Sequence, residues 1–79
     1  MNAELKEAIQ ARKFRLMELS GLIDRNLREI KGGFARYPLV KISEMPLHSL
    51  AQLLNDTARL QDEYRDVQRE IEMGERELS

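Results

Sequence analysis

The feature that most constrains this chain is a row of side chains, mostly apolar, between residues 50 and 78, which we call a seam. Its members recur at alternating spacings of three and four, the heptad pattern of helices that pack along their length. They are Leu50, Leu53, Thr57, Leu60, Tyr64, Val67, Ile71 and Leu78. Gly74 leaves a hole in this row, so we expect fraying beyond about Met73 unless a partner covers Leu78. A helix with such a seam must lie against another helix, from this chain or from a second copy.

The first part of the chain carries a matching seam, which predicts a helix over about residues 3–31. Its apolar side chains are Leu5, Ile9, Leu16, Leu19, Ile23, Leu27 and Ile30. Arg12 interrupts the row, and we expect its aliphatic stem to pack at the edge while its guanidinium stays in water. Phe14 and Met17 lie on the opposite face, which suggests that this helix contacts a second neighbour.

Glycine and proline mark the expected helix ends. Gly32 and Gly33 follow the first helix, and glycine at this place predicts a left-handed cap that ends it. Pro46 suits the first turn of a second helix, over about residues 46–77, because the missing proline N–H would have no partner there in any helix. Residues 32–45 are then the connection between the two helices.

This connection is unusually long and apolar for a helical hairpin, which needs about two to eight connecting residues. It contains Phe34, Tyr37, Leu39, Val40, Ile42 and Met45. Three interpretations stay open: the segment packs over the end of the bundle, residues 39–43 form a short strand that pairs with a symmetry mate, or the segment binds a partner. For the last interpretation, the candidate docking residues are Phe34, Tyr37, Leu39 and Ile42.

Charge is distributed unevenly along the chain, although the net charge is only -1. Residues 1–41 hold nine Lys or Arg against five Asp or Glu, whereas residues 42–79 hold four against nine. Halves of opposite sign attract each other, which favours an antiparallel hairpin or a complementary subunit contact. Exposed ion pairs contribute only about 0–1 kcal/mol each, so charge sets the orientation of the helices more than their stability.

With 79 residues, the chain is expected to form one domain, of a size at which a single core is marginal. It has no cysteine for a disulfide, so oligomerisation is the remaining source of stability. We therefore predict an all-α, two-helix antiparallel hairpin over residues 1–79, completed as a four-helix bundle or coiled coil by homo-oligomerisation, with a dimer as the first choice. The residues expected to carry self-association are Ile9, Leu16, Ile23, Leu50, Leu53, Leu60, Tyr64 and Ile71.

Residues for chemistry are scarce in this sequence. His48 is the single histidine, which argues against a zinc or haem site, and Ser49 beside it has no indicated base or oxyanion hole. We therefore expect no catalytic residue, no metal site and no cofactor. The run Leu22–Arg25 is similar to a helical pattern of chorismate mutases. That resemblance implies a dimeric helical bundle that binds an anionic small molecule, but the third helix of that family is missing, so it is a remote alternative.

Nucleic-acid binding is the main alternative function. The candidate contacts are Lys6, Lys13, Arg28 and Lys31, most of which share one side of the first helix. Small dimeric helical hairpins that bind RNA, such as the Rop plasmid regulator, resemble this chain in architecture, although their connections are short. The negative net charge weakens attraction to phosphate, so this function is not favoured.

The favoured function is a non-enzymatic protein–protein interaction or assembly module, such as an adaptor, a small regulator or a helical chaperone with a protein partner. No apolar run is long enough to span a membrane, and no charged segment followed by an apolar one follows Met1. We accordingly expect no membrane contact and a cytoplasmic location.

Overall fold

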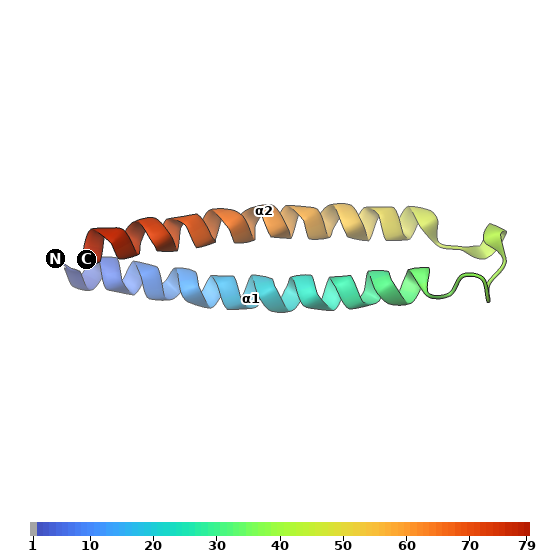
Figure 1. Ribbon diagram of the computed structural model, residues 1–79, viewed down its shortest axis with the longest axis horizontal. Helices are drawn as coiled ribbons and strands as arrows, with labels where there is room; N and C mark the ends of the chain where they lie inside the picture. Colours follow the sequence, from blue (N-terminus) through green and yellow to red (C-terminus); the bar gives the residue numbers. More distant parts are fainter. Residues whose placement is uncertain (1) are drawn as a thin grey trace.

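The computed structural model describes residues 2–79 and shows two long helices lying side by side (Figure 1). Helix α1 spans Asn2–Phe34, the short 3-10 helix η1 spans Ile42–Glu44, and helix α2 spans Leu47–Leu78. Both ends of the chain lie at one end of the hairpin, and the connection lies at the other (Figure 1). The predicted all-α, two-helix antiparallel hairpin is confirmed.

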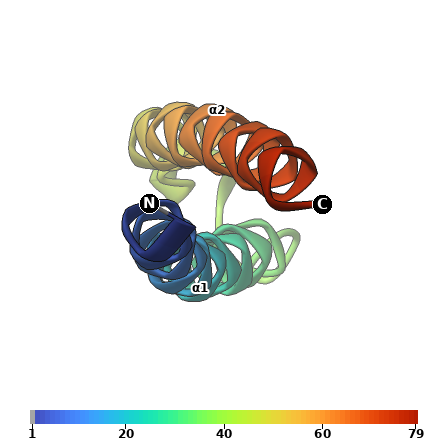
Figure 2. The ribbon, with the colours of Figure 1, turned by 90° about the vertical axis from the view of Figure 1, so that its left-hand side faces the viewer.

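The two seams pack against each other within one chain. Leu19 is fully buried and forms a core cluster with Ile9, Val67 and Ile71. Partly buried side chains extend this cluster along the hairpin: Leu5, Leu16, Leu60, Tyr64 and Leu78. The end-on view in Figure 2 shows that the helices cross at a small inclination, as expected for heptad packing.

The polar member of the α2 seam is also satisfied inside the hairpin. Thr57 is only 4% exposed, and its Oγ1 donates a hydrogen bond of 2.6 Å to the carbonyl oxygen of Leu53. A buried hydroxyl costs stability when it lacks a partner, and this bond to the preceding turn of the same helix removes that cost.

Gly32 and Gly33 do not end α1, so the predicted glycine cap is wrong. The helix continues to Phe34, and no glycine in the described chain has a positive φ. Gly33 instead lets the backbone of α1 lie close to Leu50 of α2, because a Cβ at this position would clash with the side chain of Leu50. The helix ends instead in tight turns ahead of Pro38, which lacks an N–H and disfavours helix in the residue before it.

The connection is partly packed and partly exposed. Val40 and Met45 are half-buried, as the packing interpretation expected, but the four candidate docking residues are all more than half exposed. Residues 42–44 form the turn of η1 instead of the extended segment that one interpretation required. Pro46 lies one residue ahead of α2, and its carbonyl accepts a hydrogen bond of 2.9 Å from the N–H of Leu50.

Gly74 leaves no hole, and the expected fraying beyond Met73 does not occur. Gly74 is buried, and a Cβ built on it would lie 2.9 Å from Ile9 Cγ1 and 3.0 Å from Ile9 Cδ1. The α1 side chain therefore fills the space that the missing Cβ leaves. Helix α2 continues to Leu78, which packs against the core from within the same chain.

This close contact predicts opposite effects for alanine at two helical glycines. Alanine at the exposed Gly21, which has nothing within 4 Å of a built Cβ, should stabilise the fold by about 0.5–1 kcal/mol through helix propensity. Gly74→Ala should destabilise the fold, because an overpacking cost of about 1–3 kcal/mol against Ile9 outweighs the gain in helix propensity. Urea unfolding followed by circular dichroism measures both changes, and equal stabilisation of the two variants would contradict the tight Gly74–Ile9 contact.

Candidate functional site

The seam between the helices has two edges, and ion pairs bridge one of them beside a hollow of about 350 Å³ that Arg12 and Arg15 help to line. Arg15 donates from Nε and Nη2 to the two carboxylate oxygens of Glu63, at 2.7 and 2.9 Å. Arg12 donates from Nε to Glu70 at 2.8 Å. These four residues are called the closed flank. They join the basic half of the chain to the acidic half, as the charge distribution predicted, and Arg12 lies at the edge of the seam as expected.

The paired charges shift each other's proton affinity. The hydrogen bonds from Arg15 are the largest cause of the lowered pKa of Glu63, and the same bonds raise the pKa of Arg15. Both side chains remain about two-fifths exposed, so solvent screens the attraction between them. The fork-shaped contact mainly fixes the geometry of this edge.

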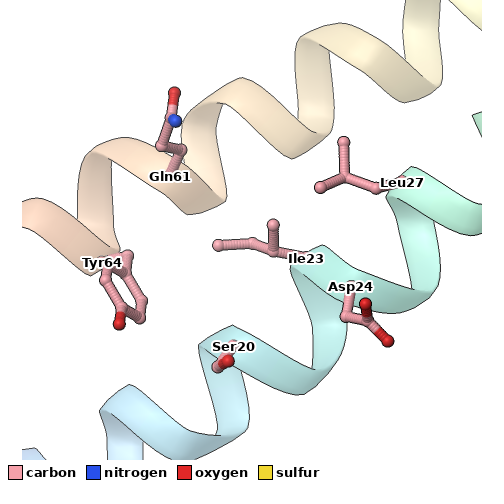
Figure 3. A pocket seen from close by; sticks show the side chains of 6 residues that line it. All are labelled: Ser20, Ile23, Asp24, Leu27, Gln61 and Tyr64. Carbon is pink, nitrogen blue, oxygen red and sulfur yellow. The ribbon is translucent and has the colours of Figure 1, made fainter.

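The other edge is open and apolar in the half nearer the connection. Its residues, called the open flank, are Ile23, Leu27, Leu54, Ala58, Gln61 and Tyr64. They line two adjoining hollows of about 300 and 250 Å³ that share Ile23, Leu27 and Gln61. Figure 3 shows Ile23 and Leu27 reaching from α1 towards α2, and Tyr64 reaching back towards α1.

The chemistry of the open flank suits packing against another protein surface. Leu27 is 51% exposed and Leu54 is 50% exposed, although both lie beside the buried seam. The carboxylate of Asp24 borders the hollow but points away from it (Figure 3). Within residues 2–79, no three His, Asp or Glu side chains are grouped so that they could hold a metal ion. An aliphatic surface of this kind offers apolar contact area.

The residues predicted for self-association contribute first to the hairpin itself. Ile9, Leu50 and Ile71 are buried within the chain. The remaining five are half-buried: Leu16, Ile23, Leu53, Leu60 and Tyr64. Of the predicted residues, Ile23 and Tyr64 therefore also reach the open flank.

Sequence reasoning missed Leu54 and Ala58 as surface contacts and left Leu27 out of the self-association set. A signal for Leu54 was present, because Leu47 and Leu54 lie seven residues apart beside the seam. They widen the apolar stripe over two heptads, before Gln61 ends it, and a stripe wider than one partner helix covers is typical of bundle helices.

The predicted docking residues lie together at the connection end, which we call the tip. Phe34 is 51% exposed, Tyr37 57%, Leu39 90% and Ile42 73%. They lie at the opposite end of the hairpin from the two termini (Figure 1). The tip is therefore a second apolar surface, separate from the open flank.

The candidate nucleic-acid contacts do not gather into one free cluster. Lys13 lies 3.9 Å from Glu75, and Arg28 forms an ion pair of 2.9 Å with Asp24. Lys6 and Lys31 lie near opposite ends of α1, about 37 Å apart along the helix axis. Arg12 and Arg15 are also engaged, in the ion pairs of the closed flank.

The Arg15–Glu63 pair predicts a pH-dependent stability. Because the pKa of Glu63 is lowered in the fold, its carboxylate stabilises the protein above its unfolded pKa, and this contribution is lost as pH falls through the lowered value. Glu63→Gln should therefore melt at a lower temperature than the parent at about pH 7, and the difference should shrink as the pH falls below the unfolded glutamate pKa of about 4.3 and through the lowered folded pKa. Thermal unfolding across pH measures this. The control Glu72→Gln, on an exposed face, should show no such difference, and a pH-independent loss in Glu63→Gln would contradict the charge effect.

The comparisons with known proteins supply no relative for this chain. No protein-family model matches it, and no similar protein was found among curated proteins or solved structures. Neither helix in the described part of the chain has a stretch long and apolar enough to cross a membrane.

Proposed function

We propose that this protein is a non-enzymatic assembly module, in which two copies of the hairpin pack through their open flanks into a four-helix bundle. The observation that carries this proposal is the contrast between the two edges of one seam. Arg12 and Arg15 join one edge to carboxylates of α2 and border a hollow lined by small side chains, whereas the other edge leaves the large side chains of Leu27 and Leu54 half exposed next to the core. Leucines that continue a buried heptad stripe are best covered by another helix of the same kind.

The shape of the single chain supports a partner of this size. The hairpin measures 61 × 15 × 14 Å and has a radius of gyration of 18.0 Å, against about 12 Å for a compact domain of this length. It exposes 6474 Å², whereas a compact monomer of 9.2 kDa exposes about 4,900 Å². The excess is larger than the roughly 800 Å² per subunit that a stable interface buries.

A second copy fits the open flank better than a single added helix does. Each chain contributes aliphatic side chains from both helices, Leu27 from α1 and Leu54 from α2, on either side of the hollows. Such a surface is two helices wide, so its natural complement is another two-helix surface. A two-fold symmetric contact uses the same patch on both subunits, which this arrangement provides.

Polar substitution on the open flank should weaken association without loss of helix. The double variant Leu27→Gln/Leu54→Gln removes about 2–3 kcal/mol of apolar burial from each copy, so a symmetric dimer loses it twice and its dissociation constant should rise about a thousandfold or more. Glutamine has nearly the helix propensity of leucine, so each helix should form as before. Light scattering and circular dichroism across a dilution series measure the two effects on one sample.

The matched control is Phe14→Gln/Met17→Gln, which removes two apolar side chains of similar exposure, 60% and 71%, from a different face of α1. It should leave the dissociation constant unchanged. Equal weakening by the two double variants, or a parent that stays monomeric at all concentrations, would overturn the proposal.

In the proposed assembly the tip is the surface that binds a protein partner. Its side chains are exposed and lie at the end of the hairpin, beyond the open flank. An adaptor or small regulator of this design would assemble through its helices and present its tip.

The tip proposal predicts that tip and assembly are separable. The triple variant Phe34→Ser/Tyr37→Ser/Leu39→Ser should keep the helicity, the oligomeric mass and the dissociation constant of the parent, because these side chains belong neither to the core cluster nor to the open flank. Circular dichroism and light scattering test this. Unfolding of the variant would show that the tip belongs to the core, and loss of the dimer would assign self-association to the tip.

A further inference from the structure

The open edge of the seam changes its chemistry along its length. On α1, Lys13, Ser20 and Leu27 follow one another at intervals of seven, so they share this edge. On α2 the same edge runs from Leu54 to Glu75. It is therefore aliphatic near the tip and charged near the termini, where Lys13 of α1 lies 3.9 Å from Glu75 of α2.

Two symmetric arrangements bring two such edges face to face. If the two-fold axis runs along the hairpin, both tips lie at the same end, and α1 of each copy faces α2 of the other. If the axis runs across the hairpin, the tips lie at opposite ends, and each helix faces its own copy. The two arrangements place different side chains opposite each other, so the sequence of the edge discriminates between them.

Charge complementarity favours the arrangement with the tips together. It places Leu27 of one copy at the same height as Leu54 of the other, and Lys13 at the same height as Glu75 of the second copy. The aliphatic halves then cover each other, and Lys13 of each copy lies at the height of Glu75 of the other.

The arrangement with the tips apart is less complementary. With full overlap it sets the aliphatic half of one copy against Lys13 and Glu75 of the other, which desolvates charges without pairing them. With overlap of the aliphatic halves alone, the terminal halves stay uncovered.

We infer that two copies pack along their open edges with both tips at the same end, an inference that rests on the proposed assembly through the open flank. The consequence is a bundle that presents two tips side by side. Each tip exposes Phe34, Tyr37, Leu39 and Ile42. A partner with two matching sites would then bind both tips with an effective concentration that a single hairpin cannot provide.

Spin-label distances test this arrangement, because the chain has no cysteine and a single introduced one is a unique label site. Gln10→Cys places a label near the termini, and Ser43→Cys places one at the tip; both positions are exposed. With neighbouring helix axes about 8–10 Å apart, the expected arrangement holds both label pairs within about 30 Å. If the tips lie apart and the copies pivot about Leu27, the Gln10 labels should be about 50 Å from each other, from the rise per residue along two helices.

The outcomes separate this inference from the proposed function. Short distances at both sites, abolished by an excess of unlabelled chain, support the inference. A dimer in which either label pair is about 50 Å apart or farther overturns the arrangement and leaves assembly through the open flank standing, since full overlap with the tips apart separates the Ser43 labels and a pivot at Leu27 separates the Gln10 labels. A monomeric mass with no spin–spin coupling at either label site overturns both the arrangement and the proposed assembly. A dimer whose dissociation constant is the same in Leu27→Gln/Leu54→Gln as in the parent also overturns both.

Discussion

The rest of the structure depends on the burial of one heptad seam between α1 and α2. A helix of about thirty residues with an apolar stripe is not stable in water unless the stripe is covered, and here each helix covers the other. Leu19 has no exposed surface, and the cluster around it extends from the middle of the hairpin to the end that holds the termini, while Ile30 and Leu50 are buried nearer the connection. Helix length, antiparallel orientation and the position of the tip all follow from this contact, because within residues 2–79 the core cluster is built from these two helices alone.

Two glycines bring the backbones close enough for this seam to be continuous. A side chain at Gly33 would meet Leu50, and one at Gly74 would meet Ile9. Large residues of one helix therefore lie over small ones of the other, which is how facing layers interdigitate without voids. Between these points, Arg15 and Glu63 hold one edge of the seam in a fixed geometry.

A hairpin of two helices has two edges but only one core, and the difference between the edges leads to the functional proposal. On one edge, the aliphatic stems of the arginines pack on apolar surface, and their guanidinium groups form ion pairs with carboxylates. On the other edge Leu27 and Leu54 also lie beside the core, but half of their surface is exposed. An exposed aliphatic surface beside an ordered core is the usual mark of a contact with another protein.

The sequence by itself determined the two helices, their seams and their pairing by charge, because heptad spacing and the unequal halves are properties of the order of residues. It also marked the tip residues as too apolar for an ordinary loop, and the structure places Phe34, Tyr37, Leu39 and Ile42 at the surface. These features depend on local order alone, so they can be recognised before any tertiary contact is known.

Only the tertiary structure decided what the glycines do and which edge stays open. In the sequence, Gly33 and Gly74 look the same as glycines that end a helix or interrupt a seam. Their role as points of close approach is visible only in the fold, where Leu50 lies against Gly33 and Ile9 lies against Gly74 from the facing helix. The open flank likewise depends on how α1 and α2 are rotated about their own axes. That rotation fixes which residues beside the seam meet across it as ion pairs and which, such as Leu27 and Leu54, remain uncovered.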